Sequence, residues 1–412
     1  MIKLIETFSG IGAQAQALDN INADYSVVAT VDWEVGAIYA YDILHNGKQD
    51  LSKYRHHTKD SLIDILSRFN LSSDGKHPLS QNGLKIMPTW QLKTLLAAIV
   101  RSNNFIDITS VHAKNLPEGN VLTYSFPCQD LSLARHWHHN TGGIDRDANN
   151  RSSLLWQIER LLKEYVVIDK ELPQFLLMEN VSAILSKKNI GNFEEWCGVL
   201  EDLGYINQVY TLDSRNFGVP QSRTRTYMLS VRATTEAQRE RVKSFFKDNN
   251  LEKVERAPEE INPIGDYLRL DYSVEKYRRE AIESTPNFTD SRQKIYRNSK
   301  ILAVGSQPQS QMVANTVTTK QDRDPNSGIV DYGNKPLTAV NTHYRNLTPR
   351  ECFLLMGFKE ADYDTLMENN REVREGSRLL NNSELIKLAG NSIVVPVLEA
   401  IFKQVEELQT MI

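Results

Sequence analysis

Cys128 is the residue of this 412-residue chain whose type and setting best fit a catalytic nucleophile. It stands in the turn 125–129, directly after the apolar run 121–124 and beside Pro127, which rigidifies the backbone. Most buried cysteines are inert, small apolar residues. A thiol in a turn at the end of a strand is instead open to a ligand, and its thiolate can bond covalently to a substrate where the site favours deprotonation. The sequence therefore predicts covalent catalysis through Cys128.

One acid and two arginines could stabilise charge during such a reaction. Glu179 ends the apolar run 175–178, where burial would raise the pKa of its carboxyl group and keep a proton available near neutral pH. Arg223 and Arg225 precede the strand-like run 226–230, and residues two apart on a strand share a face, so both guanidinium groups could bind oxygens in one cleft. The alternatives are a structural ion pair for the glutamate and an exposed strand edge for the arginines.

A third set of residues predicts a pocket for a ligand that contains adenosine. The glycines of the loop Phe8-Ser9-Gly10-Ile11-Gly12 follow the first apolar run and would let a ligand approach the backbone closely. Asp32 ends the second run and could accept hydrogen bonds from ribose hydroxyl groups, while the indole of Trp33 could stack on adenine. Asp107, after a further run, could accept from the adenine amino group. A tight turn and plain core packing of Trp33 are the alternatives.

Short apolar runs alternate with helical patterns in the first half of the chain. We expect strands at 3–7, 25–31, 105–108, 121–125 and 175–178, and helices at 13–20 and 35–44. Such alternation is typical of parallel β-α-β units, so the predicted fold is α/β, a doubly wound and mostly parallel Rossmann-like sheet with a second, smaller domain. Ligands bind at the carboxyl ends of such strands, where the polar segments above stand.

The pattern of the sequence changes near residue 232. A charged helix is expected at 232–256, then polar residues with short β-prone pieces such as 313–319, and helical patterns again at 348–356 and 383–407, the latter interrupted at 392–397. We therefore predict a catalytic domain over residues 1–231, a smaller domain over 232–343, and a C-terminal segment 344–412 that returns to the first domain.

Composition and charge narrow the class of protein. We expect a cytoplasmic globular protein, because 40% of residues are hydrophobic, 24% are charged, and no apolar run approaches the ~18 residues that cross a membrane. Three cysteines without a CxxC pair argue against a disulfide scaffold and a cysteine zinc site. The net charge is −4, but residues 215–300 hold 18 Lys/Arg against 13 Asp/Glu, which suits either a phosphate-facing surface or a solvated mixed-charge face.

In their order along the chain, these motifs resemble those of the DNA (cytosine-5)-methyltransferase family. The loop 8–12 resembles the family's loop for S-adenosylmethionine, and Pro127-Cys128-Gln129 resembles its nucleophile motif. Glu179-Asn180-Val181 and the Gln-x-Arg-x-Arg run at 221–225 resemble its other catalytic motifs. Gly390-Asn391-Ser392, with Val395 nearby, is similar to its C-terminal cofactor motif, and 348–351 to the segment that closes its recognition domain.

The resemblance covers residues 3–230 and 345–402 and leaves only the region between them unmatched. The sequence segments 124–132 and 177–181 are similar to those of bacterial CpG-type members. Two residues depart from the family's pattern: Ala13 replaces a common third glycine, and Asp32 replaces a common glutamate, so its ribose contact requires a closer approach.

The resemblance implies a methyl transfer from S-adenosylmethionine to carbon 5 of a cytosine flipped out of duplex DNA, with S-adenosylhomocysteine as the product. Cys128 would add to carbon 6, Glu179 would protonate ring nitrogen 3, and Arg225, with Arg223 behind it, would hold the oxygen at position 2. The cofactor residues that it implies are Phe8, Ser9, Gly10, Ile11, Gly12, Asp32, Trp33, Asp107, Ile108, Pro127, Leu154, Asn391, Ser392 and Val395.

The stretch 130–150 is expected to be a loop that closes over DNA. Gln129, Ser132, Arg135 and His136 are the expected DNA contacts. A metal site formed by the histidines at 136–139 is disfavoured because no cysteine or acidic partner stands near them, so we expect no metal.

Double-stranded DNA is the expected partner. We expect a monomer that belongs to a restriction–modification system and forms no stable complex with its endonuclease. The alternatives are an RNA (tRNA) cytosine-5 methyltransferase with the same catalytic residues, a catalytically silent DNA-binding regulator, and a Rossmann dehydrogenase. The long variable segment disfavours the first, the full set of catalytic residues the second, and the incomplete GxGxxG spacing the third.

Overall fold

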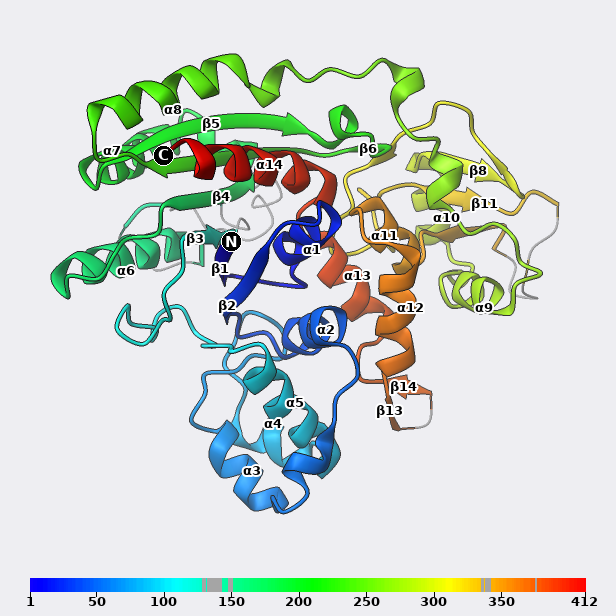
Figure 1. The fold of residues 1–412 in the computed structure, drawn as a ribbon. Coiled ribbons are helices and arrows are strands. Elements are labelled where there is room, and N and C mark those ends of the chain that lie inside the picture. Colours follow the sequence, from blue (N-terminus) through cyan, green and yellow to red (C-terminus); the bar gives the residue numbers. More distant parts are fainter. Residues whose placement is uncertain (128–130, 132–142, 147–150, 335–336, 338–341, 375) are drawn as a thin grey trace. The chain divides into compact units, whose positions relative to one another are not determined.

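The computed structural model describes residues 1–127, 131, 143–146, 151–334, 337, 342–374 and 376–412 of the chain. The chain divides into two compact units. Unit 1 consists of residues 1–212, 224–253 and 398–412, and unit 2 of residues 213–223 and 254–397. Both are shown in Figure 1, and each is described by itself.

Unit 1 is built on a six-stranded sheet with the order β2-β1-β3-β4-β7-β5. Its strands are β1 (Ile2–Thr7), β2 (Tyr25–Val31), β3 (Val121–Tyr124), β4 (Phe175–Val181), β5 (Tyr205–Asp213) and β7 (Thr224–Arg232). The pairs β1/β2, β1/β3 and β3/β4 are parallel, whereas β7 runs antiparallel to β4. The predicted α/β fold with a mostly parallel sheet is therefore confirmed.

Helices follow the strands as the alternation of patterns predicts. Those of unit 1 are α1 (Ala13–Asn20), α2 (Val35–Asn46), α3 (Lys59–Leu66), α4 (Gln81–Ile86), α5 (Thr89–Arg101), α6 (Leu155–Val167), α7 (Ile190–Asp202), α8 (Glu236–Asp248) and most of α14 (Val395–Met411). The segment 105–108 is not a strand. The residue before it, Asn104, forms only an isolated β-bridge with Thr30. The charged pattern at 232–256 forms the α-helix α8, where Thr235 and Gln238 make a capping box, and a short 3-10 helix at Leu251–Lys253.

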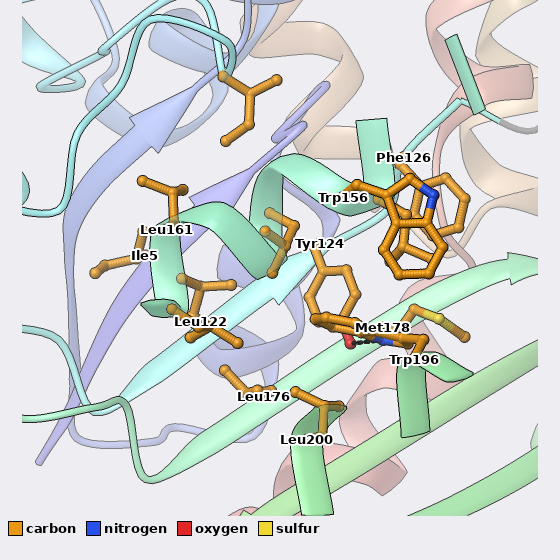
Figure 2. Close-up of a cluster of buried hydrophobic side chains, with 14 of the residues drawn as sticks. Ile5, Leu122, Tyr124, Phe126, Trp156, Leu161, Leu176, Met178, Trp196 and Leu200 are labelled. Carbon is orange, nitrogen blue, oxygen red and sulfur yellow. Dashed lines mark hydrogen bonds between the residues drawn. The ribbon is translucent and has the colours of Figure 1, made fainter. Parts of the chain in front are cut away.

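The two faces of the sheet bury different kinds of side chain. On one face, Ile5, Leu122 and Leu176 join residues of α6 and α7 in the hydrophobic core shown in Figure 2. Successive strand residues point to opposite faces. Glu6 and Thr123 therefore point to the face covered by α1 and α2, where they meet buried polar groups. The apolar face holds the sheet together, and the more polar face lies beneath the first strand–helix loop.

Unit 2 holds the remaining short strands and helices. Its four-stranded sheet has the order β12-β11-β8-β9, and two smaller pairs are β10/β6 and β13/β14. The strands are β6 (Gln221–Ser222), β8 (Ile301–Val304), β9 (Gln307–Pro308), β10 (Ala314–Asn315), β11 (Ile329–Asp331), β12 (Tyr344–Asn346), β13 (Glu372–Arg374) and β14 (Ser377–Arg378). The helices are α9 (Glu275–Glu283), α10 (Asp290–Asn298), α11 (Pro349–Leu355), α12 (Glu360–Asn369) and α13 (Asn382–Asn391).

The chain passes from one unit to the other at residues that differ from the predicted domain boundaries. Helix α8 belongs to unit 1, where Asn249 at its end binds Gln404 of α14. Of the C-terminal segment only 398–412 belongs to unit 1, and 344–397 belongs to unit 2. In unit 2, Arg345 of β12 forms two 2.7 Å hydrogen bonds with Glu351 of α11, which ties the strand to the helix that follows it.

The stretch Asn382–Met411 is long and apolar enough to cross a membrane by length and composition, contrary to our expectation that no segment approaches this limit. It contains α13 and α14, which residues 392–394 separate, and 61% of its most apolar window is buried inside the protein. A helix buried to this degree is typical of a protein core. Among the described residues no second stretch of this kind occurs.

A buried pair of aromatic side chains links β3 to α7. Substituting one of them tests how much this contact contributes to the stability of the core. The indole Nε1 of Trp196 donates to the hydroxyl of Tyr124 at 3.0 Å, as Figure 2 shows. We expect Tyr124→Phe to lower the free energy of unfolding by about 1–3 kcal/mol, because the buried indole N–H loses its acceptor. Urea denaturation measures the change.

Trp196→Phe supplies the matched variant for this prediction. In the double variant Tyr124→Phe, Trp196→Phe neither partner is left unsatisfied, so its cost should be smaller than the sum of the two single costs. Strictly additive costs would show that the hydrogen bond contributes nothing.

Candidate functional site

The register of four strands brings the expected functional segments to one edge of the sheet. Thr7 of β1 lies opposite Val31 of β2 and Tyr124 of β3, and Tyr124 lies opposite Met178 of β4. These strands are parallel, so the residues that follow them emerge on the same side. The loop 8–12, Asp32, the segment 125–127 and Glu179 therefore share this edge, as predicted from the sequence.

The loop between β1 and α1 adopts a backbone that its glycines permit. Phe8, Gly10 and Gly12 all have positive φ angles, of 56°, 55° and 74°. A Cβ on Gly12 would collide with the rings of Tyr41 and His45, whereas a Cβ on Gly10 would meet no atom within 4 Å. Gly10 therefore leaves open space beside the backbone, which is what the close approach of a ligand requires.

Asp32 fixes this loop. Its Oδ2 accepts from the backbone N–H of Gly10 at 2.8 Å, and its Oδ1 accepts from that of Glu34 at 2.9 Å. Asn104 binds both backbone groups of Asp32, since its Oδ1 accepts from the N–H at 3.1 Å and its Nδ2 donates to the carbonyl at 3.0 Å. A carboxylate has about four acceptor directions. The geometry thus fits a carboxylate that holds the loop in place at the end of β2.

Trp33 and Asp107 complete the expected adenosine pocket. Trp33 is partly exposed, and its carbonyl accepts from the N–H of Ser72 at 2.8 Å. Asp107 is partly exposed as well, and its Oδ2 accepts from Nδ2 of Asn70 at 2.6 Å. Ile108, its neighbour, is 5% exposed. The donor and acceptor types present at this edge fit an adenine and a ribose.

A buried acid lies directly beneath the loop. Glu6 of β1 is fully buried, accepts from the hydroxyl of Tyr41, and accepts from the N–H of Ala15 at 3.2 Å. Burial raises the pKa of Glu6 to about 7. A ring nitrogen of His45 lies 2.9 Å from the carbonyl of Ile11, and burial lowers the pKa of this histidine. The loop therefore rests on a cluster of protonatable groups that favours the uncharged form of each.

The chain that leads to Cys128 is held at the same edge. The carbonyl of Phe126 accepts from Nδ2 of Asn180 at 3.0 Å, and the carbonyl of Pro127 accepts from Oγ of Ser152 at 2.8 Å. Leu154, two residues beyond Ser152, directly precedes α6 and is partly exposed. Cys128 itself lies outside the described residues, so its predicted role as nucleophile stays a prediction.

Glu179 and Arg225 come together at the ends of β4 and β7. Glu179 lies opposite Tyr227, and Arg225 lies opposite Val181. Arg225 Nε is 3.5 Å from Glu179 Oε1, and the two side chains are only 17% and 13% exposed. An acid and a guanidinium group that are partly shielded from water can act on one small ligand, as the sequence analysis proposed.

Arg223 does not share this arrangement. The strand β7 begins at Thr224, so the rule that residues two apart on a strand share a face does not apply to Arg223 and Arg225. Arg223 belongs to unit 2, is 4% exposed, and donates to the carbonyls of Val317 at 2.9 Å, Ser392 at 2.7 Å and Gly390 at 3.2 Å. These contacts give Arg223 a structural position within unit 2.

The C-terminal cofactor motif also belongs to unit 2. Asn391 is exposed, Ser392 is 7% exposed, and Val395 is fully buried with its N–H bonded to the carbonyl of Met356 at 2.9 Å. A Cβ on Gly390 would lie within 2.6 Å of the backbone of Thr318, so only glycine permits this packing. The predicted cofactor contacts of Asn391, Ser392 and Val395 stay predictions.

The expected DNA contacts Gln129, Ser132, Arg135 and His136 lie outside the described residues. Within the described part of the chain, no three His, Cys, Asp or Glu side chains are grouped so as to hold a metal ion. The histidines at 136, 138 and 139 fall outside that part.

A surface hollow along α6 does not coincide with this edge. It has a volume of about 560 Å³ and lies along α6, and its lining residues are His112, Lys114, Trp156, Glu159, Arg160, Lys163, Glu164, Val167 and Ile168. None of the expected catalytic or cofactor residues lines it. Several of its charged residues are paired with each other, such as Arg160 with Glu164 at 2.6 Å.

Sequence reasoning missed three asparagines that position the expected groups: Asn70, Asn104 and Asn180. Asn180 belongs to the motif 179–181, so the sequence already marked it as a residue close to the expected site. Asn104 precedes the run 105–108 in the same way. Asn70 carried no signal at all, since it lies 37 residues before its partner Asp107.

Comparison with known proteins agrees with the geometry. A sequence model of the family described as C-5 cytosine-specific DNA methylase matches residues 83–407. The chain is 31% identical to the orphan methyltransferase M.SssI of Spiroplasma monobiae, covering 98% of this chain and 97% of that protein. It is 30% identical to the type II methyltransferase M2.ScrFI of Lactococcus lactis subsp. cremoris, covering 98% and 99%.

Solved structures share the fold at lower sequence identity. The Dnmt2 methyltransferase of S. pombe superposes with a TM-score of 0.61 at 20% identity, covering 99% of each chain. The methyltransferase EhMeth of Entamoeba histolytica gives a TM-score of 0.57 at 16% identity, covering 99% of this chain and 98% of its own.

The buried Glu6 predicts a pH dependence of stability. Because its pKa is raised above the ordinary 4.5 to about 7, the neutral carboxyl stabilises the fold fully below pH ~4.5, and this contribution is lost as the pH rises through 7. Glu6→Gln keeps a neutral side chain, so the variant should gain stability relative to the wild type between pH 5 and 8, by up to about 3 kcal/mol.

Thermal denaturation from pH 5 to 8 measures this difference. The groups that face Glu6 or its partners are Tyr41, Tyr25, His45 and Asp19, and their own titration is common to both proteins. Replacing the exposed Glu171 by glutamine is the control and should give a pH-independent difference. A flat difference for Glu6→Gln would show that Glu6 is ionised throughout.

Proposed function

The chain belongs to the C-5 cytosine-specific DNA methylase family, and from this premise we propose that it methylates carbon 5 of a cytosine in a short specific sequence of double-stranded DNA. The methyl donor is S-adenosylmethionine and the product is S-adenosylhomocysteine. As a member of this family the chain is an enzyme of the DNA (cytosine-5-)-methyltransferase type.

The observation that carries the proposal is the pairing of Glu179 with Arg225 at 3.5 Å, beside the segment that ends in Pro127. Asn180, the residue after Glu179, holds the carbonyl of Phe126 at 3.0 Å. An acid, a guanidinium group and the chain leading to a thiol therefore meet at one sheet edge. A pyrimidine bound there would meet all the groups that the reaction requires.

The reaction starts with the thiolate of Cys128, which adds to carbon 6 of the cytosine. This sulfur–carbon bond pushes the ring's electron pair toward carbon 5 and puts negative charge on the ring. Arg225 turns from Glu179 to the oxygen at position 2, and Glu179 donates a proton to ring nitrogen 3. Carbon 5 takes the methyl group, and S-adenosylhomocysteine is left behind. A base then removes the proton of carbon 5, the sulfur of Cys128 leaves as a thiolate, and ring nitrogen 3 returns its proton to Glu179.

The other two cysteines are poorly suited to this role. Burial raises the pKa of Cys197 to about 11, and Cys352 is fully buried with its pKa raised further. A nucleophilic cysteine must be available as a thiolate near neutral pH. Cys128 is therefore the residue to which we assign the attack.

The residues at the edge fit S-adenosylmethionine, which supplies the methyl group when it is bound. Gly10 leaves room beside the backbone, Asp32 would accept from ribose hydroxyl groups, and Trp33 would stack on the adenine ring. Asp107 would accept from the adenine amino group. Phe8, Ser9, Ile11, Ile108, Pro127 and Leu154 would form the remaining wall. The resemblance assigns cofactor contacts to Asn391, Ser392 and Val395 as well, and we propose that role for them.

DNA must present its cytosine outside the stack, because carbon 5 and carbon 6 are inaccessible to a side chain in a stacked duplex. Unit 2 offers exposed cations for the phosphate backbone, with Arg278 and Arg279 on α9 and Lys294 and Arg297 on α10. We propose that the segment 232–343 reads the target sequence, and that Gln129, Ser132, Arg135 and His136 contact the DNA beside the flipped base.

We further propose that the enzyme acts as a cytoplasmic monomer in a restriction–modification system, without a stable complex with its endonuclease. The designation of the relative M2.ScrFI as a type II methyltransferase supports this setting. The relative M.SssI is designated an orphan methyltransferase, so action without an endonuclease is the alternative.

Methyl transfer to defined substrates tests the function. We expect the purified protein to transfer radiolabelled methyl groups from S-adenosylmethionine to duplex DNA and not to tRNA. Bisulfite sequencing of the product DNA should then show that one short sequence is methylated. The same measurement shows whether that sequence contains CpG, as the similarity to CpG-type members suggests. Methylation of tRNA alone would overturn the proposal in favour of an RNA enzyme.

Cys128→Ser tests the nucleophile. Since serine is far less nucleophilic than a thiolate, turnover should fall by at least about 10³-fold while duplex binding changes little. DNA with 5-fluorocytosine at the target should form a covalent complex with the wild type, because fluorine cannot leave as the proton does. The variant should form none. Cys197→Ser is the matched control, and full turnover in Cys128→Ser would refute the assignment.

A further inference from the structure

The segment 67–78 lies between α3 and α4, and it contacts both residues that we assign to the adenine ring. Ser72 donates its backbone N–H to the carbonyl of Trp33 at 2.8 Å and accepts from the N–H of Val35 at 2.8 Å. Asn70, two residues earlier, donates its side-chain amide to Asp107 at 2.6 Å. Trp33 and Asp107 are 74 residues apart in sequence, yet one short segment reaches both.

This segment is held firmly in place. Ser72 is fully buried, and its hydroxyl donates to the carbonyl of His77 at 2.7 Å and accepts from the N–H of Gly75 at 3.0 Å. Asp74 accepts from the backbone N–H groups of Lys76 and His77 at 2.8 and 2.9 Å. Asn70 is therefore presented by a preformed turn, and this turn does not depend on the Asn70 side chain.

The carboxylate of Asp107 is oriented from two sides. Oδ1 accepts from the N–H and the hydroxyl of Thr109 at 2.9 and 2.8 Å, and Oδ2 accepts from Asn70. A carboxylate offers about four acceptor directions, so these donors occupy three and leave one on Oδ2. An amino group bound there would meet an acceptor whose direction Asn70 and Thr109 have fixed.

We propose that Asn70 is a positioning residue for adenine recognition: its amide aims Oδ2 of Asp107 at the 6-amino group of the adenine ring. This inference rests on the proposed function, because it requires the adenosine pocket at Asp32, Trp33 and Asp107. It assigns a part in selecting the nucleobase to a segment outside every motif that the sequence analysis identified.

The chemistry predicts selectivity and not merely affinity. A carboxylate accepts from an amino group but repels a carbonyl oxygen in the same place. S-adenosylhomocysteine and its 6-oxo analogue, S-inosylhomocysteine, differ at this position and at the adjacent ring nitrogen 1, which carries a hydrogen only in the oxo form. If Asn70 aims Asp107, its loss weakens the amino form and leaves the oxo form almost unchanged. If Asn70 only supports the fold, its loss weakens both equally.

Calorimetric binding of these two ligands to the purified full-length protein is the test. Asn70→Ala should raise the Kd for S-adenosylhomocysteine about tenfold, the scale of one charge-assisted hydrogen bond, and should reduce the preference over the 6-oxo analogue by the same factor. Asn82 is an exposed asparagine in α4, the helix that follows the segment 67–78. Asn82→Ala is the matched control and should bind as the wild type does.

Asn70→Asp adds a pH-dependent readout. At pH 8 its carboxylate would face that of Asp107 and repel it, so binding should be weaker than in Asn70→Ala. As the pH falls, one proton between the two groups restores a donor, and affinity for S-adenosylhomocysteine should recover. Pure loss of folding would give no recovery.

The outcomes separate this inference from the proposed function. If the wild type does not bind S-adenosylhomocysteine, or if Trp33→Ala binds it normally, the adenosine pocket itself is wrong. If Trp33→Ala loses binding while Asn70→Ala keeps wild-type affinity and preference, only the role of Asn70 fails. Tighter binding by Asn70→Ala would show that Asn70 competes with the ligand for Asp107, and that would also overturn the inference.

Discussion

The parallel register of β2, β1, β3 and β4 sets where every expected functional segment of unit 1 emerges. Because Thr7 lies opposite both Val31 and Tyr124, and Tyr124 opposite Met178, four segments leave the sheet side by side. A shift of one residue in any pair would turn the following side chain to the opposite face. The hydrophobic core between the sheet and helices α6 and α7 makes such a shift costly, since it would expose that core.

Short polar side chains convert this register into a site. Asp32 binds the N–H of Gly10, Asn104 binds the backbone of Asp32, and Asn180 binds the carbonyl of Phe126. Each bond links the end of one strand to a neighbouring segment, so the groups that must act together cannot drift apart. Displacements of about 1 Å can lower catalytic rates greatly, which explains why rigid links of this kind are useful at a reaction centre.

Much of this arrangement was readable from the sequence, and some of it was not. The strands at 25–31 and 175–178, the loop 8–12 and the convergence of Glu179 with Arg225 follow from local patterns and the rule for parallel sheets. The spacing of Arg223 and Arg225 by two residues predicts that both lie in one cleft, which holds only where both belong to the strand. The strand begins one residue later, and the carbonyls of Val317, Gly390 and Ser392 hold its guanidinium group instead. Periodicity cannot locate such strand ends to one residue.

Residue types along the chain already give the kinds of group available and their order: a thiol, an acid, an arginine and a glycine loop, each beside a strand. These follow from nearest neighbours along the chain, where residue type and spacing act directly. The folded chain is needed to see which distant residues bind those groups, as Asn70 binds Asp107 and Tyr41 binds Glu6. The reason is physical, because a hydrogen bond depends on separations of about 3 Å in space and leaves no periodic trace in the sequence between its partners.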